Sequence, residues 1–169
     1  MRMAKYSAGL LLLWAGFVLP LQAAERHHEV QGGFSYEVPE AWQVRDYPGL
    51  KYQILFTQPV DNFAPNVNFV DEVYPGDLDS YVEANLPTLE KMLNGFELVS
   101  RGSGKTRQGR EYRSLQYKQQ SQSGELIQLS YFMKLEKDRK LVVTCTTRSK
   151  DASRFEKVFS GIVSSIRME

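Results

Sequence analysis

The chain has 169 residues, of which 42% are hydrophobic and 24% are charged, a composition typical of a folded domain rather than of a disordered or collagen-like chain. Its 21 basic and 20 acidic residues nearly cancel, so the sequence lacks the electrostatic footprint of a nucleic-acid-binding protein. The single cysteine, Cys145, excludes an intramolecular disulfide and a cysteine-based zinc site.

Residues 1–23 are predicted to be a signal peptide. Arg2 and Lys5 provide a positive start, residues 8–19 form an apolar run, and small residues follow up to Ala23. The apolar run is shorter than the roughly 20 residues that a membrane-spanning helix needs. We therefore expect cleavage after Ala23 and an exported protein, in the periplasm or outside the cell, that does not span the membrane.

The remaining chain divides into a flexible lead-in over residues 24–32 and a single domain over residues 33–169, with no linker or repeat inside the domain. The domain begins with predicted strands. Apolar and polar residues alternate over residues 34–38, which is the period of a half-buried strand. The same alternation predicts strands at residues 52–56 and 67–73.

A helix is predicted next, because apolar residues recur at three- and four-residue spacing from Leu78 to Leu93. Asp77 stands where an N-cap residue is expected, and Gly95 follows the last apolar position. Pro87 interrupts this pattern. Since proline lacks a backbone N–H and its ring clashes with the preceding turn, we expect a kink or a break into two short helices there.

Further strands are predicted at residues 96–101, 110–120, 125–135 and 141–146. The short polar turns between the later strands favour antiparallel pairing, because parallel strands need a long crossover. The chain closes with an amphipathic helix whose apolar stripe runs over residues 155–166 and must dock on a sheet. The sequence therefore predicts an α+β domain with a mainly antiparallel sheet.

No catalytic motif is found. Residues 101–106 end in Gly-Lys-Thr, as a phosphate-binding loop does, but Val99 stands where that motif needs its first glycine, and we interpret the segment as a solvated hairpin loop. His27 and His28 lie in the lead-in, where a catalytic base would not be held rigidly. Cys145 lies on an apolar strand face and is interpreted as a buried, inert thiol. We expect no catalytic, cofactor-binding or metal-binding residue and no enzyme activity.

One metal site stays open as an alternative. If cleavage falls after Ala24, the mature chain begins Glu25-Arg26-His27, and its amine, two amides and imidazole could form a square-planar nitrogen site for Cu(II) or Ni(II). Cleavage after Ala23 moves the histidine to the fourth position and removes this geometry.

Three segments together resemble the PsbP-like family: Gly-Phe-Ser-Tyr-Glu-Val-Pro-Glu-Ala-Trp at residues 33–42, Ala-Pro-Asn-Val-Asn-Phe at 64–69, and Leu-Val-Val-Thr-Cys-Thr at 141–146 before a Phe-rich terminal helix. The resemblance covers nearly all of the domain. It implies an α/β/α sandwich in which an antiparallel sheet of about six strands carries helices on both faces. It also implies a non-enzymatic accessory role, without the long N-terminal arm of PsbP or the lipid-attachment cysteine of the DcrB proteins.

Five residues of these segments are predicted to be structural landmarks: Pro39, Trp42, Pro65, Asn66 and Cys145. Pro39 is expected to end a strand, and Trp42 is large enough to cover one edge of the core. Asn66 lies on the polar side of a predicted strand, where solvation is the simpler interpretation and ligand binding is the alternative.

Three functions remain possible from the sequence. An exported accessory protein that supports the assembly or stability of an envelope or membrane complex would bind a protein partner through an exposed apolar patch of several hundred Å². A carrier of a small apolar ligand would hold it between sheet and helix in a cavity of about 300–1,000 Å³. A histidine-independent hydrolase would need converging carboxylates with shifted pKa values. We favour the first, and expect no nucleic-acid partner and no cofactor.

Overall fold

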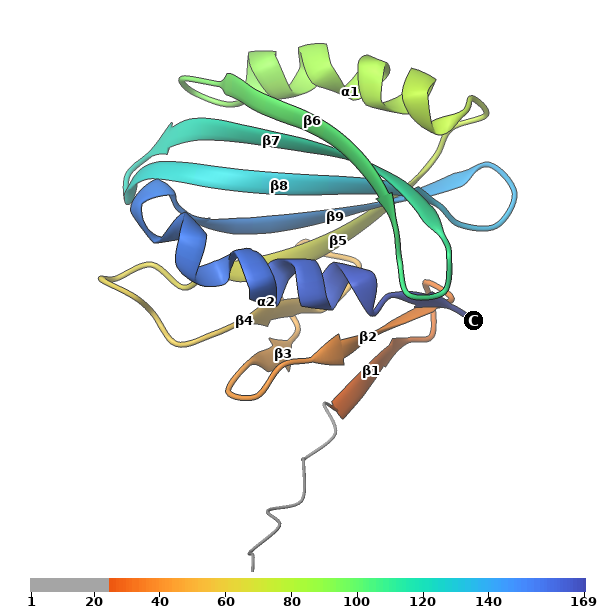
Figure 1. The fold of residues 1–169 in the computed structure, drawn as a ribbon, viewed down its shortest axis with the longest axis horizontal. Helices are drawn as coiled ribbons and strands as arrows, with labels where there is room; N and C mark the ends of the chain where they lie inside the picture. Colours follow the sequence, from red (N-terminus) through yellow and green to blue (C-terminus); the bar gives the residue numbers. More distant parts are fainter. Residues whose placement is uncertain (1–24) are drawn as a thin grey trace, which may run out of the picture.

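The structure, a computed structural model, describes residues 25–169 and contains two antiparallel sheets and two long helices (Figure 1). The elements in chain order are β1 (Glu25–Glu29), β2 (Phe34–Val38), β3 (Gln43–Arg45), β4 (Ile54–Phe56), β5 (Asn66–Val73), α1 (Leu78–Met92), β6 (Glu97–Lys105), β7 (Glu111–Ser121), β8 (Gly124–Lys134), β9 (Arg139–Arg148), a 3-10 turn (Ser149–Asp151), α2 (Ala152–Ser164) and β10 (Arg167–Met168). The predicted signal peptide lies outside the described residues. Within residues 25–169, no helix has the length and apolarity that crossing a membrane would require.

The larger sheet has seven strands in the order β3-β4-β5-β9-β8-β7-β6, and all neighbouring strands are antiparallel. The alternation in β9 has the predicted effect, because Leu141, Val143 and Cys145 are all fully buried on one face. The sheet has one strand more than the six expected from the family resemblance. The three-residue β3 is too short to show a period in the sequence, and it forms only because it pairs with β4.

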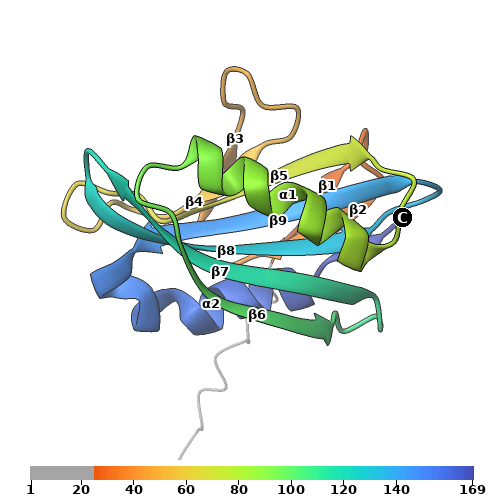
Figure 2. The ribbon, with the colours of Figure 1, turned by 90° about the horizontal axis from the view of Figure 1, so that it is seen from above.

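The two helices cover opposite faces of this sheet, which confirms the predicted α/β/α sandwich (Figures 1 and 2). On one face, α2 buries Phe155, Phe159 and Ile162 against a core that includes Phe69 of β5. On the other face, α1 packs over β7 and β8 through a smaller cluster. Figure 2 shows that α1 lies obliquely across the strands. The sheet faces therefore differ in how completely they are covered.

The predicted break at Pro87 does not occur, and α1 is one helix from Leu78 to Met92. Its start is capped as predicted, because Asp77 Oδ1 accepts a hydrogen bond from the N–H of Ser80 at 2.7 Å. Pro87 itself is exposed, whereas Tyr81 before it and Leu89 after it both pack against the sheet. Packing on both sides of the proline stabilises a single helix, and this tertiary gain outweighs the lost backbone hydrogen bond.

Strand β6 extends to Lys105, so residues 101–105 belong to a strand and not to the predicted solvated loop. Gly104 lies opposite Tyr112 on β7, and a Cβ atom at Gly104 would come too close to the tyrosine ring. This glycine therefore makes room for a neighbouring aromatic side chain rather than for a phosphate group.

The second sheet contains β1, β2 and β10, with β2 in the centre. The predicted lead-in over residues 24–32 therefore includes a strand, which pairs with β2 along its whole length. This strand was not predicted because its residues are all polar and show no apolar alternation. Glu29 is nonetheless buried and accepts a hydrogen bond from the N–H of Gln53 at 3.1 Å, while the rings of His27 and Tyr36 lie 5.3 Å apart.

Candidate binding groove

An open groove of about 560 Å³ lies on the α1 side of the seven-stranded sheet. It is formed by the first turn of α1, the turn between β6 and β7, and the adjoining ends of β8 and β9. This volume falls within the range of ligand sites in proteins. The charged side chains that line it are Asp77, Asp79, Arg110, Glu111, Arg113, Lys134 and Lys140.

The wall formed by α1 is held by an ion pair. Arg113 on β7 donates two hydrogen bonds to Asp79, from Nε to Oδ1 at 2.6 Å and from Nη2 to Oδ2 at 3.1 Å. This contact with Arg113 lowers the pKa of Asp79, and the hydrogen bond from the N–H of Ser80 lowers the pKa of Asp77. Both carboxyl groups are therefore ionised near neutral pH and cannot donate a proton.

The opposite wall is the β6–β7 turn, which is internally hydrogen-bonded. The N–H of Thr106 donates to the carbonyl of Arg110 at 2.9 Å, and the N–H of Gly109 donates to the carbonyl of Thr106 at 2.8 Å. Gly109 has a φ of 79°, a conformation that favours glycine. The Thr106 side chain is buried, which holds this end of the turn in place.

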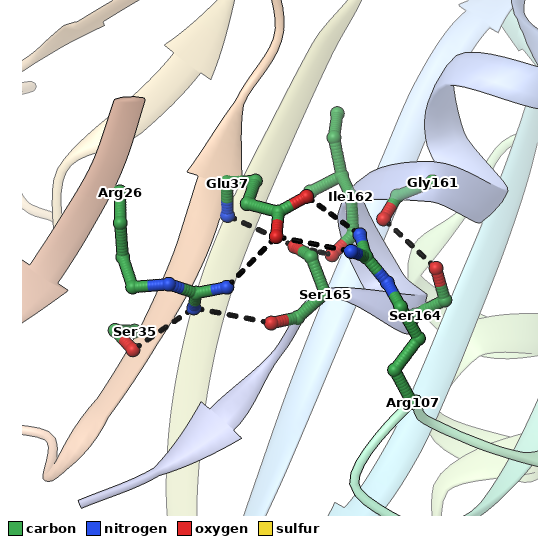
Figure 3. Close-up of polar contacts among 8 residues, drawn as sticks. All are labelled: Arg26, Ser35, Glu37, Arg107, Gly161, Ile162, Ser164 and Ser165. Carbon is green, nitrogen blue, oxygen red and sulfur yellow. Dashed lines mark hydrogen bonds and ion pairs between the residues drawn. The ribbon is translucent and has the colours of Figure 1, made fainter. Parts of the chain in front are cut away.

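Figure 3 shows how this turn is attached to the rest of the molecule. Glu37 on β2 accepts hydrogen bonds from Arg107 at 3.0 and 2.6 Å and from Arg26 at 3.0 Å. The N–H of Arg107 also donates to the carbonyl of Ser164 at 2.8 Å, and the N–H of Glu37 donates to Ser165 Oγ at 2.9 Å. The hydrogen bond from Arg107 lowers the pKa of Glu37. The turn is therefore fixed to β2 and to the end of α2.

Three basic groups of the groove have no acidic partner. Ion pairs within 4 Å join Arg113 to Asp79 and, at the rim, Lys105 to Glu111, but among residues 25–169 none involves Arg110, Lys134 or Lys140. Arg110 and Lys140 donate instead to backbone carbonyl groups. The groove consequently combines charge of both signs with three cations that are free of carboxylate contacts.

The landmark residues lie elsewhere, and none of them lines the groove. Pro39 directly follows β2, and Trp42 is half-buried with its ring edge-on to Phe155 and Phe159. Pro65 is buried before β5, and Asn66, the first residue of β5, donates from Nδ2 to the carbonyl of Ala64 at 3.0 Å. Cys145 is fully buried in β9.

The groove residues were not predicted from the sequence, although one signal was available. Lys134 lies near the end of one predicted strand and Lys140 at the end of the charged turn that follows it, and a tight antiparallel hairpin places two such positions close to each other on one face, where they are register partners. The contribution of α1 and of the β6–β7 turn had no comparable signal, because these segments meet only in the folded chain.

The other candidate sites are closed or too small. Burial raises the pKa of the Cys145 thiol, which keeps it protonated and unreactive. A pocket between the sheet and α2, lined in part by Leu129 and Phe159, encloses about 200 Å³, which is below the volume expected of an apolar carrier site. Exposed large apolar side chains in residues 25–169 lie on five different segments of the chain, and only Val70 and Val73 share a strand: Val30, Tyr47, Val70, Val73, Met92 and Val99.

The structure also bears on the copper alternative. Residues 25–27 are paired with β2 in an extended strand, and His27 Nε2 lies 3.3 Å from a Glu29 carboxylate oxygen. A square-planar chelate wraps the first three residues around the metal, so its formation would require this end of β1 to leave the sheet. Within residues 25–169, no three His, Cys, Asp or Glu side chains are grouped to hold a metal ion.

No protein-family model and no curated protein matches the sequence. The fold, however, is similar to solved structures. Cyanobacterial PsbP from Synechocystis sp. PCC 6803 has a TM-score of 0.65 at 14% identity, covering 94% of this chain and 99% of that one. LpqN of Mycobacterium tuberculosis, described as involved in cell envelope biogenesis, has a TM-score of 0.64 at 14% identity, covering 86% and 84%.

A third similar structure is the Ran-binding protein Mog1p of Saccharomyces cerevisiae, with a TM-score of 0.55 at 10% identity, covering 86% of this chain and 95% of that one. At such low identities the likeness concerns the fold rather than the function. The predicted resemblance is confirmed at that level: the chain has the fold of the PsbP-like proteins.

Proposed function

We propose that this protein is an exported, non-enzymatic accessory protein that supports the assembly or stability of an envelope or membrane complex by binding a protein partner. The fold is shared with PsbP and with LpqN, and the second of these is described as acting in cell envelope biogenesis. The groove supplies the binding surface.

The chemistry of the groove carries this proposal. Hydrogen bonds lower the pKa of its Asp77 and Asp79 carboxyl groups and so keep both ionised, and the basic groups that line it include no histidine. General acid–base catalysis needs a group whose pKa lies near the working pH, within reach of the reacting atom. Charged groups of both signs in an open groove can instead provide electrostatic complementarity to another protein, which steers association and fixes the register of the contact.

Co-purification of the tagged full chain from the envelope fraction tests this function. We expect one protein in stoichiometric amount with the wild type, and its loss with the double variant Arg110→Glu and Lys134→Glu. Lys157→Gln, an exposed substitution on α2 outside the groove, should retain the partner and serves as the control. Mass spectrometry of the same material tests cleavage after Ala23.

Two outcomes would reject the proposal. One is the absence of any stoichiometric protein partner, and the other is a partner that the groove variant retains as well as the wild type. Circular dichroism of both variants would verify that they remain folded.

A further inference from the structure

Two lysines occupy directly opposed positions at the floor of the groove. Lys134 on β8 and Lys140 on β9 are register partners, and like charges directly opposite each other in a sheet are destabilising. Neither has a carboxylate oxygen within 4 Å among the residues described. The folded chain therefore carries an electrostatic cost at this position that no carboxylate among the described residues offsets by direct contact.

Lys140 makes this cost larger, because the residue is only 1% exposed. Its Nζ donates to the carbonyl of Tyr74 at 2.6 Å and lies 3.4 Å from the carbonyl of Asp138. Buried ammonium groups are normally paired with an acidic group. Glu72 is the register partner of Lys140 on β5, but its Oε2 accepts the hydroxyl hydrogen of Tyr81 at 2.8 Å instead.

Arg110 brings a third cation to the same place. Its Nη1 donates to the carbonyl of Lys134 at 3.3 Å, which leaves other N–H groups of the guanidinium available. The turn that carries it is fixed on its far side by the contacts of the Arg107 guanidinium with Glu37 (Figure 3) and by the hydrogen bond from the N–H of Arg107 to the carbonyl of Ser164. The three cations are therefore presented by rigid elements, as a recognition site requires.

The remaining lining residues indicate which anion fits. Asp77, Asp79 and Glu111 would repel a phosphate group or a polyanion, and the chain's balanced charge provides no field to attract one. A single carboxylate within a polypeptide carries less charge than a phosphate group, and the backbone N–H groups beside it can donate to the same acidic residues and so offset the repulsion.

From these observations we propose that Arg110, Lys134 and Lys140 form a carboxylate-binding subsite that takes one Asp or Glu side chain from an extended segment of the protein partner. Lys134 and Arg110 contact the carboxylate, and the buried Lys140 adds its charge from below. This inference rests on the proposed function and specifies the chemistry of the partner.

A peptide titration followed by NMR tests the subsite. The probe is the blocked peptide acetyl-Gly-Gly-Glu-Gly-Gly-amide, compared with the same peptide carrying Gln and with sodium phosphate. The Glu peptide should shift the amide signals of residues 108–111, 134 and 140. The substitution Lys134→Gln should weaken this binding by about tenfold or more, because it removes one charge-assisted hydrogen bond to the carboxylate. The exposed Lys157→Gln should leave the binding unchanged.

Equal binding of the Glu and Gln peptides, or stronger binding of phosphate, would overturn the proposal. A partner found by co-purification would still support the proposed function in that case, so the two failures are distinguishable.

Thermal unfolding provides a second test that does not need a ligand. Lys134→Gln removes the like-charge contact and should raise the unfolding midpoint by about 1–4 °C, even as it weakens peptide binding. If Lys134 served only to stabilise the fold, Lys134→Gln would lower the unfolding midpoint instead of raising it, so a lowered midpoint would also overturn the proposal.

Discussion

The two faces of the seven-stranded sheet have different compositions and different coverings. The face under α2 is covered by a continuous aromatic core, in which Phe34, Tyr36 and Phe69 pack on one another. The face under α1 has a smaller core and is left partly open, with Val70 of β5 41% exposed and the charged groove at one end. The face under α2 thus contains the larger apolar core, while the face under α1 leaves room for charged side chains at one end.

Truncation of the covered core should have the largest effect. Phe159 is 1% exposed and its ring lies 6.1 Å from that of Trp42. Phe159→Ala should lower the free energy of unfolding by about 3–5 kcal/mol. Leu89→Ala on the half-buried side of α1 should cost only about 1–2 kcal/mol. Urea unfolding followed by circular dichroism measures both changes. Equal losses in the free energy of unfolding would contradict the difference between the two faces of the sheet.

The next largest effect concerns Asp71, at the edge of the covered face. Burial alone would raise its pKa, but hydrogen bonds from Lys51, Arg139 and Tyr52 more than offset this and lower the pKa to about 2. Because the pKa is lower in the folded than in the unfolded chain, the ionised group contributes about 2 kcal/mol of stability above pH ~4.

This contribution is lost as the pH falls from about 4 through 2. Asp71→Asn should therefore lower stability at pH 7 by about 2 kcal/mol and flatten the dependence of stability on pH in that range. Thermal unfolding between pH 2 and 7 measures this. Asp46→Asn, at an exposed position, is the matched control. If the stability of Asp71→Asn depended on pH as steeply as that of the wild type, the lowered pKa of Asp71 would be contradicted.

A smaller effect on stability is expected from the ion pairs that attach the β6–β7 turn to β2. Glu37→Gln removes the negative charge that binds Arg26 and Arg107, and should lower stability by about 1 kcal/mol. Amide hydrogen exchange should become faster at residues 106–110, because their attachment to β2 is weakened. The exposed Glu40→Gln provides the comparison. Exchange that is unchanged in that turn would show that Arg107 does not hold it.

The smallest effect is expected on the open face. Gln128 accepts a hydrogen bond from Gln119 at 2.8 Å and donates to Thr146 at 3.1 Å, on the partly open side of the sheet. Water can replace both contacts there, so Gln128→Ala should change the free energy of unfolding by less than about 1 kcal/mol. A loss comparable with that of Phe159→Ala would show that this face also stabilises the fold.

The sequence was informative wherever a residue's neighbours along the chain decide its environment. The alternation over residues 34–38 predicted β2 with the observed bounds, and the Phe155 stripe predicted the buried side of α2. The continuity of α1 through Pro87 could not be predicted in this way, because it depends on packing against a sheet whose strands come from later in the chain.

The polar strand β1 was missed for a related reason. Its residues Glu25–Glu29 have no apolar period, and the buried side chain of Glu29 finds its hydrogen-bond partner at Gln53, in a segment beyond the next strands. A polar side chain can be buried when its hydrogen bonds are satisfied, and that condition is visible only in three dimensions.

The α+β class, the antiparallel pairing and the buried sides of most strands and of both helices could be predicted from the chain alone, because these follow from periodicity, turn length and proline or glycine placement. Which face of the sheet stays partly open, and the proximity of Arg110 to Lys134 and Lys140, follow from the folded arrangement of distant segments. The physical reason is that charges along a chain are solvated independently, and their unfavourable proximity arises only when strand pairing and a fixed turn hold them in one groove.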